Sequence, residues 1–392
     1  MINIKRTLAF TAVTLLFAGC PSEPIPFNPP SSEYPEAFLM YSNNTKRLFN
    51  YLFDSYGNVI ISGQMDAAWA ENSRIDMITR VYNDVGKYPA MKGFDLIDLP
   101  YSWSNYGKNE IDEAVEWWNG QNRKDEKQPA ETLLPGKPDI HGIVSFCWHW
   151  RVTGWRSNDP ETASMEFYTN QTNFRIPMKA GKLDTTHANF QTIKSDLDKA
   201  AALLQQLKDK DIPVLWRPLH EASGRWFWWG ASGPEAYIAL WEYMYDYLTN
   251  EKKLNNLIWV WNGQHRDWFP NPNTAHIVGY DYYVPSSQPA QNYSSQVSTF
   301  VRTLEMVPNK DRIVALTENG AIPDPVNCKN DNAMWSWFMT WNDSTNGTNV
   351  TSSSNFWSGE HHNTKAHKQY VYNHELVITL DELPDLTKYK LE

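Results

Sequence analysis

The sequence predicts a (β/α)8 TIM barrel of the α/β class, built as a single domain. Three observations lead to this fold. From residue 58 onward, short apolar runs alternate with helical patterns, which is the order of elements in a parallel α/β protein. Most of these runs lack alternation of polar and apolar residues, as expected of parallel strands buried on both faces. The length of 392 residues is enough for one large domain with a sizeable core.

Eight apolar runs are the predicted strands. They cover residues 59–62, 90–96, 140–148, 213–217, 257–261, 277–281, 313–317 and 335–341. A doubly wound open sheet is the alternative, and periodicity alone does not separate the two folds. No Gly-x-Gly-x-x-Gly follows a strand to support the nucleotide site that such a sheet often carries.

Helical patterns lie between these runs. The clearest covers residues 190–210, where Ile193, Leu197, Leu204 and Leu207 fall on one apolar stripe. Further helices are expected at residues 73–82, 111–118, 233–249 and 293–305, with a weaker pattern at 364–372. A helix after the run 257–261 is poorly supported, because the segment 267–273 contains two prolines.

The N-terminus has the pattern of an export signal. Lys5 and Arg6 precede an apolar run that is far shorter than the roughly 20 residues needed to span a bilayer. The run ends in Ala18-Gly19-Cys20, which resembles a bacterial lipobox, in which the cysteine is lipidated and becomes the new N-terminus. An ordinary cleaved signal with an incidental cysteine is the alternative.

These patterns divide the chain into three parts. Residues 1–20 are expected to be a lipoprotein-type signal ending at the lipidated Cys20, and the proline-rich residues 21–39 to be a tether. Residues 40–392 form the predicted barrel domain. The expected location is the bacterial outer membrane, at its periplasmic or surface face, with membrane contact only through the N-terminal lipid.

Composition limits the classes of partner. The net charge is −10, and without a basic patch nothing would neutralise phosphates, so nucleic acid is not an expected partner. The chain has 19 tryptophans although its mean hydropathy is −0.58, which favours either flat ligand-binding surfaces or a very aromatic core. Three cysteines do not make a disulfide framework. Cys147 is expected to be a buried apolar side chain, and whether it meets Cys328 stays open.

Two predicted strands end in a glutamate. The first is followed by Glu221 in Trp216-Arg217-Pro218-Leu219-His220-Glu221, and the second delivers Glu318 in Leu316-Thr317-Glu318. In a barrel, residues at the C-terminal ends of strands line the active site. Two carboxylates there suit glycoside hydrolysis, in which one group protonates the leaving oxygen and the other attacks or stabilises the sugar. A zinc protease is excluded for His220-Glu221, because a second histidine would be needed at position 224, which is glycine.

These motifs, together with Trp226-Phe227-Trp228-Trp229-Gly230, resemble glycoside hydrolase family 26 over roughly residues 45–375. Its best-known members are β-mannanases with a (β/α)8 catalytic domain. The resemblance implies that Glu221 is the acid/base and Glu318 the nucleophile. It also implies a substrate-binding role for His220, which stands where much of the larger clan has asparagine.

Further substrate-binding residues follow from the same resemblance. Arg217 lies on a barrel-lining strand, and a buried arginine needs a carboxylate partner, for which Glu318 is the natural candidate. Such a charge would favour the ionised nucleophile. His149 and Trp341 end strands, Trp155 lies in a loop and Trp226 follows Glu221, all at positions where a sugar could be bound. Tyr283 matches the tyrosine that contacts the nucleophile in the family, with Tyr282 as the competitor at this strand end.

The expected activity is therefore that of a retaining endo-β-1,4-mannanase acting on mannan, galactomannan or glucomannan as a monomer, without metal or organic cofactor. Two alternatives stay open. The same fold and mechanism could act on β-1,3-xylan or mixed-linkage glucan. A non-catalytic glycan-binding lipoprotein would explain the tryptophans, but gives no reason for two glutamates at strand ends. Asn342 departs from relatives that carry arginine beside the strand-eight tryptophan, so more distant subsites are expected to be built differently.

Overall fold

The computed structural model describes residues 40–67, 75–99, 106–124, 128–152, 167–344 and 352–391. Cys20, with the expected signal and tether, and Trp155 lie outside the described residues.

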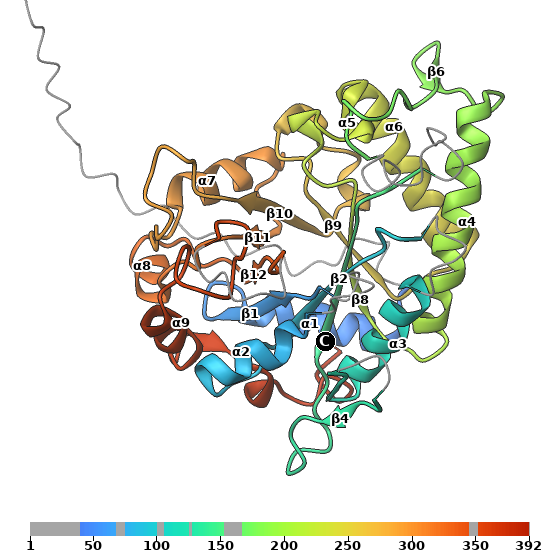
Figure 1. Ribbon diagram of the computed structural model, residues 1–392. Coiled ribbons are helices and arrows are strands. Elements are labelled where there is room, and N and C mark those ends of the chain that lie inside the picture. Colours follow the sequence, from blue (N-terminus) through green and yellow to red (C-terminus); the bar gives the residue numbers. More distant parts are fainter. Residues whose placement is uncertain are drawn as a thin grey trace, which may run out of the picture.

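Eight parallel strands form a closed barrel, seen along its axis in Figure 1. In barrel order they are β1 (Ile60–Met65), β2 (Met91–Asp95), β5 (Ile143–Trp148), β8 (Val214–Pro218), β9 (Leu257–Trp261), β10 (Ile277–Tyr282), β11 (Ile313–Asn319) and β12 (Trp337–Thr340). The ring closes because β12 pairs with β1, from Ile61 opposite Trp337 to Gln64 opposite Thr340. This pairing confirms the predicted barrel and excludes the open doubly wound sheet.

All eight predicted strands are present, and their burial explains why the sequence reveals them. In β8 and β9, every residue is buried, so both faces of each strand are covered, and nearly all of their side chains are apolar. The central tryptophans Trp216, Trp259 and Trp261 are completely buried. Most of the tryptophans that made the composition unusual therefore serve as core.

Helices surround the barrel (Figure 1). The expected ones are α2 (Met77–Val85), α3 (Tyr106–Trp118), α4 (Ala188–Lys208), α6 (Pro234–Tyr245), α7 (Val297–Met306) and α9 (Lys365–Tyr372). After β9 the described chain forms only two short 3-10 turns, Arg266–Trp268 and Pro272–Thr274, in the segment whose prolines argued against a helix. Within the described ranges, three α-helices were not predicted: α1 (Asn43–Ser55), α5 (Trp228–Ala231) and α8 (Pro325–Asn330). In the described part of the chain, every helix is too short or too polar to cross a bilayer.

Besides the barrel and its helices, the described residues form two small hairpins and one extra strand. The hairpins pair β3 (Gln121–Asn122) with β4 (Glu131–Thr132) and β6 (Met178–Lys179) with β7 (Lys182–Leu183). The extra strand, β13 (Val377–Ile378), pairs with β1 on the outside of the ring.

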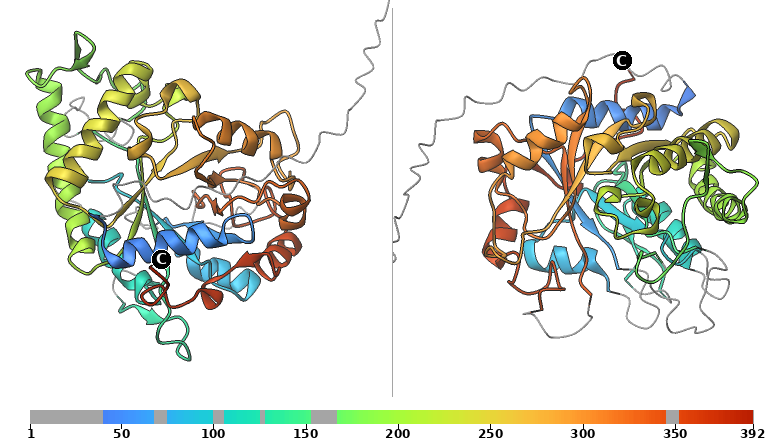
Figure 2. Two further views of the ribbon diagram at one scale, coloured as in Figure 1. Left: turned by 180° about the vertical axis from the view of Figure 1, so that it is seen from behind. Right: turned by 90° about the horizontal axis from the view of Figure 1, so that it is seen from above.

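Helix α1 marks the face of the barrel at the N-terminal ends of the strands. The Ser42 N–H donates to the carbonyl of Asn255, just before β9, and Asn44 Nδ2 donates to the carbonyl of Asp211, just before β8. The C-terminal segment lies on the same helix, where Arg47 Nε donates to the carbonyl of Tyr389 at 3.2 Å (Figure 2). The two ends of the described chain therefore meet at the barrel face opposite the two glutamates.

Candidate active site

The two glutamates found at strand ends lie together. Glu221 follows β8 and Glu318 lies near the end of β11. Single carboxylate oxygens of Glu221, Glu318 and a third acid, Asp281 of β10, all lie within 4.8 Å of one another. Three acidic groups thus share one small volume at the C-terminal end of the barrel.

A bulge near the end of β11 sets the direction of Glu318. Tyr280 of β10 pairs with Leu316, whereas its neighbour Asp281 pairs with Glu318, so Thr317 is the extra residue. An extra residue of this kind bends the strand and re-aims the side chains that follow. Gly279 makes room for the bulge, because a Cβ there would lie 2.5 Å from the Thr317 side chain.

Two donors hold the carboxylate of Glu318. Arg217, on β8, forms an ion pair with Oε1, which is the partner that the sequence analysis expected for this buried arginine. The hydroxyl of Tyr283 donates to Oε2 at 2.7 Å, so Tyr283 is the tyrosine that reaches Glu318 at this strand end. Burial, followed by the charges of Glu318 and Asp281, raises the pKa of Tyr283 well above its usual value, so the phenol keeps its proton as a donor.

Asp281 anchors this arrangement and was missed by the sequence analysis. Its Oδ2 accepts from Arg217 at 2.9 Å, and its Oδ1 accepts from Asn262 Nδ2 and Thr317 Oγ1, both at 2.7 Å. Burial raises the pKa of Asp281 to about 7; Arg217 opposes the shift and Glu318 adds to it. Asp281 therefore fixes Arg217, which in turn contacts Glu318.

Glu221 sits on an unusual backbone. Its φ of 54° lies in the left-handed region, as does that of Leu219 at 52°. Such a conformation costs a non-glycine residue roughly 1–3 kcal/mol and persists only where its surroundings enforce it. Here the Glu221 N–H donates to the carbonyl of Asn262 at 2.7 Å. The side chain accepts from Trp226 Nε1, with 2.9 Å between the nitrogen and Oε2.

Glu221 and Glu318 have different electrostatic surroundings. Burial raises the pKa of Glu221 well above its usual value, and the negative charges of Asp281 and Glu318 add to the shift, while Trp226 and Arg217 oppose it. Glu221 therefore tends to keep a proton. Glu318, by contrast, is held by the guanidinium of Arg217 and the hydroxyl of Tyr283.

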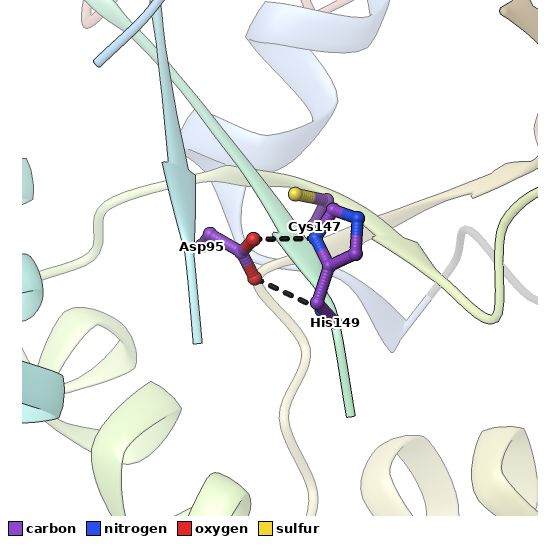
Figure 3. Close-up of side chains that lie close together, drawn as sticks. All are labelled: Asp95, Cys147 and His149. Atoms are coloured by element: carbon purple, nitrogen blue, oxygen red, sulfur yellow. Dashed lines mark hydrogen bonds and ion pairs between the residues drawn. The ribbon is translucent and has the colours of Figure 1, made fainter. Parts of the chain in front are cut away.

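A pair of histidines lies beside Glu221. Nε2 of His220 is 3.1 Å from Nε2 of His149, which follows β5. Asp95, the last residue of β2, contacts His149 twice, at its backbone N–H and at its ring Nδ1 (Figure 3). Both histidines were predicted site residues, whereas Asp95 was not.

The remaining predicted residues divide by exposure. Trp226 is 44% exposed, whereas the other aromatic residues of the run after it, Phe227, Trp228 and Trp229, are buried. Trp341, directly after β12, is half-buried, and its ring centroid lies 5.9 Å from that of His149. Both tryptophans can therefore offer part of a ring to a sugar. Asn342 instead donates from Nδ2 to the carbonyl of Asp66 at 2.8 Å and is buried.

Among the described residues, two groups of side chains have a spacing that could hold a cation. One is the set Glu221, Asp281 and Glu318, and the other is Asp95, Cys147 and His149. The carboxylates of both groups already accept hydrogen bonds from protein donors. Burial, followed by the charge of Asp95, also raises the pKa of Cys147 well above its usual value, so the unliganded side chain keeps its proton. We therefore assign both groups to hydrogen bonding.

Comparison with known proteins agrees with this geometry. Residues 40–382 match the family described as "Glycosyl hydrolase family 26". The chain is 33% identical over 362 residues to a mannan endo-1,4-beta-mannosidase of Thermothelomyces thermophilus, covering 90% of this chain and 66% of that protein. It is 30% identical to mannan endo-1,4-beta-mannosidase B of a Piromyces species, covering 86% of this chain. The chain spans only 52% of that second relative's length.

Solved structures give the same result. A Podospora anserina GH26-CBM35 beta-(1,4)-mannanase superposes with a TM-score of 0.74 at 30% identity, covering 93% of this chain and 72% of that one. A beta-mannanase from a symbiotic protist of the termite Reticulitermes speratus, complexed with gluco-manno-oligosaccharide, has a TM-score of 0.69 at 29% identity. It covers 88% of this chain and 96% of that chain. With a closed barrel, paired glutamates and a sequence match across most of its length, the chain belongs to glycosyl hydrolase family 26.

Proposed function

We propose that the chain is a retaining endo-β-1,4-mannanase that hydrolyses mannan, galactomannan or glucomannan by double displacement. The observation that carries the proposal is the pair Glu221 and Glu318, with oxygens within 4.8 Å and unlike surroundings. Retaining glycosidases hold their two carboxyl groups about 5–5.5 Å apart, whereas inverting enzymes need about 6.5–9.5 Å to admit a water. Two relatives that carry the name mannan endo-1,4-beta-mannosidase support mannan as the polymer.

In the first step Glu318 attacks the anomeric carbon while Glu221 gives its proton to the departing glycosidic oxygen. The raised pKa of Glu221 keeps that proton available at higher pH than an ordinary glutamate would allow. Arg217 and Tyr283 orient the attacking carboxylate. The product of this step is a glycosyl ester on Glu318.

In the second step water releases the sugar. The ester on Glu318 carries no charge, so one of the repulsions that raise the pKa of Glu221 disappears. The pKa of Glu221 then falls, and the carboxylate accepts a proton from the attacking water. The same side chain thus serves first as acid and then as base.

Replacing the nucleophile tests the assignment. We expect Glu318→Gln to lower kcat on soluble mannan by roughly 10³-fold or more, measured as reducing-end release. Glu305→Gln, which alters an exposed glutamate of α7, is the matched control and should retain the wild-type rate. Wild-type turnover in the Glu318 variant would overturn the proposal.

Product analysis tests the polymer and the stereochemistry. Mannan should be cut faster than β-1,3-xylan or mixed-linkage glucan, and time-resolved product lengths should show internal cleavage. Proton NMR during hydrolysis of a manno-oligosaccharide should show the β-anomer forming first. A first-formed α-anomer would contradict double displacement.

We also propose that the enzyme is exported and held at the bacterial outer membrane by a lipid on Cys20, and that it acts as a monomer. The charged start, the short apolar run and Ala18-Gly19-Cys20 support the lipid. Metabolic labelling with a tagged fatty acid tests it, because Cys20→Ala should abolish incorporation. Incorporation into the Cys20→Ala variant would place the lipid elsewhere.

A further inference from the structure

We infer that Asp95 is a positioning residue that fixes the ring protons of His149 and His220, and through them the backbone that carries Glu221. The inference rests on the proposed function for its effect on activity. Asp95 lies at the end of β2, outside every motif that the sequence offered, and is 4% exposed.

Asp95 dictates which nitrogen of His149 carries a proton. Its Oδ1 accepts the His149 backbone N–H at 2.9 Å, and its Oδ2 lies 2.6 Å from Nδ1 of the same residue (Figure 3). Burial would raise the pKa of Asp95, but the His149 contacts and the charge of Arg151 outweigh it and leave the pKa below its usual value. An ionised carboxylate only accepts hydrogen bonds. Nδ1 of His149 must therefore be the protonated nitrogen, and Nε2 can act as an acceptor.

The acceptor at Nε2 in turn dictates the proton of His220. The two Nε2 atoms are 3.1 Å apart, a distance at which one proton must lie between them. Burial, followed by His149 and Arg217, lowers the pKa of His220 well below its usual value, so His220 has a single ring proton. Its Nδ1 is buried, and the described residues offer it no hydrogen-bond partner. A buried N–H without a partner is rarer than a bare lone pair, so the proton sits on Nε2 and points at His149.

These bonds form one directed chain, in which His220 donates to His149 and His149 donates to Asp95. The chain ends at the residue next to Glu221. His220 lies between Leu219 and Glu221, whose φ values are both in the left-handed region. The carbonyl of His220 accepts from Trp229 Nε1 at 2.8 Å, so ring and backbone are both fixed. A change in the ring protons would therefore disturb the backbone from which Glu221 projects.

Asp95→Asn should reverse the direction of these hydrogen bonds, because asparagine has nearly the same shape as aspartate but carries an NH2 donor. The amide oxygen is needed by the His149 backbone N–H, so the amide NH2 would face Nδ1. Nδ1 must then lose its proton to Nε2, where it would meet the Nε2–H of His220. To avoid two opposed donors, His220 would have to carry its proton on Nδ1, which has no acceptor among the described residues. If the new amide were flipped, its oxygen would accept from Nδ1, but its NH2 would then face the His149 backbone N–H, again placing two donors against each other.

The experiment uses the full chain with 15N-labelled histidine, because NMR of the ring nitrogens reports the tautomer directly. In the wild type, His149 should be protonated at Nδ1 and His220 at Nε2. In Asp95→Asn, the proton of His149 should appear at Nε2. We expect kcat/KM on mannan to fall about 10- to 100-fold, the usual effect of a buried polar group left without its partner. Thermal melting confirms that the variant is folded.

Asp98→Asn is the matched control, since Asp98 lies in the turn three residues after Asp95 and pairs with Arg151 rather than with a histidine. It should keep both tautomers and stay within about twofold of wild-type kcat/KM, because the Asp98–Arg151 pair is not a link in the His220–His149–Asp95 chain. A wild-type His149 protonated at Nε2, or an equal loss of activity in Asp98→Asn, would overturn the inference. An unchanged tautomer in Asp95→Asn would do the same. If the wild type cut no mannan at all, the proposed function would fail, whereas the ring-nitrogen spectra would still decide the role of Asp95.

Discussion

Trp226 combines two properties that are separable by mutation. Its ring is exposed and can stack on a sugar, while its Nε1–H holds Oε2 of Glu221 at 2.9 Å. That hydrogen bond favours the ionised carboxylate and so works against the burial that raises the pKa of Glu221. The indole therefore moderates the acidity of the proposed acid as well as offering a surface.

Trp226→Phe keeps an aromatic ring and removes the donor. The pKa of Glu221 should rise further, because an interaction that lowers it is lost. Since the first step needs Glu221 protonated, the alkaline limb of the kcat/KM–pH profile should move to higher pH. Tyr82→Phe, an exposed aromatic change on α2, should leave the profile in place. An alkaline limb that stays or moves to lower pH in Trp226→Phe would refute this account.

How far the sequence predicts the site depends on how its residues are connected. Glu221 and Glu318 were identified because each ends an apolar run and lies in a specific motif. Asp95 was missed because its partner His149 is 54 residues away, just after another strand, and no local sequence pattern indicates the pairing. Asp281 was missed although it ends a predicted strand, because an acid at that place has meaning only beside Arg217 and Thr317.

Between β9 and β10, the buried His276 links two elements. Nδ1 of the His276 ring accepts the backbone N–H of Trp259 at 3.0 Å. The backbone N–H of His276 donates to the carbonyl of Trp259 at 2.9 Å. Burial, with a smaller contribution from Arg312, lowers the pKa of His276 to about 3. The folded protein therefore keeps this imidazole neutral in mildly acidic solution.

His276 should make the protein less stable in acid. Above pH 6.5, its usual pKa, the ring is neutral in both states and has no effect on the pH dependence. As the pH falls from 6.5 through about 3, only the unfolded chain takes up the proton, so the free energy of unfolding drops by up to about 1.4 kcal/mol per pH unit. His276→Asn should remove this contribution in urea unfolding between pH 7.5 and 4.5. Equal slopes in the wild type and in His276→Asn would contradict the prediction.

The bulge of β11 depends on a glycine in the neighbouring strand. Gly279→Ala would place a Cβ 2.5 Å from Thr317, whose hydroxyl donates to Asp281. We expect a loss of about 1–3 kcal/mol in the free energy of unfolding, as for other overpacked cores, together with a lower kcat. Gly136→Ala, where nothing lies within 4 Å of the new Cβ, should change neither quantity in chemical denaturation and activity assays. Wild-type stability in Gly279→Ala would contradict the prediction, because it would show that β10 and β11 can shift to admit the new Cβ.

The elements were more predictable than their contacts. All eight barrel strands appear in the sequence because burial on both faces demands continuous apolar runs. Helix α1 was missed because only part of its surface is buried, through Leu48, Phe49 and Leu52, among many polar residues. Its position depends on contacts before β8 and β9, more than 160 residues away.

At the scale of the whole molecule, the barrel from residue 40 onward should function without what precedes it. A chain lacking residues 1–39 is expected to keep the melting temperature within about 2 °C and kcat/KM within about twofold, because stability and activity arise from the barrel itself. It should also move from the membrane fraction to the soluble fraction. Thermal melting, mannan assays and cell fractionation measure the three quantities. A large loss of stability would show that residues 1–39 pack on the barrel.

The position of α1 has a consequence for how an anchored enzyme would meet its polymer. The described chain enters the barrel beside Asn255 and Asp211, at the ends of β9 and β8 that lie away from Glu221. A lipid on Cys20 would therefore connect to the barrel on the face opposite Glu221 and Glu318. A long glycan could then approach without steric conflict with the membrane.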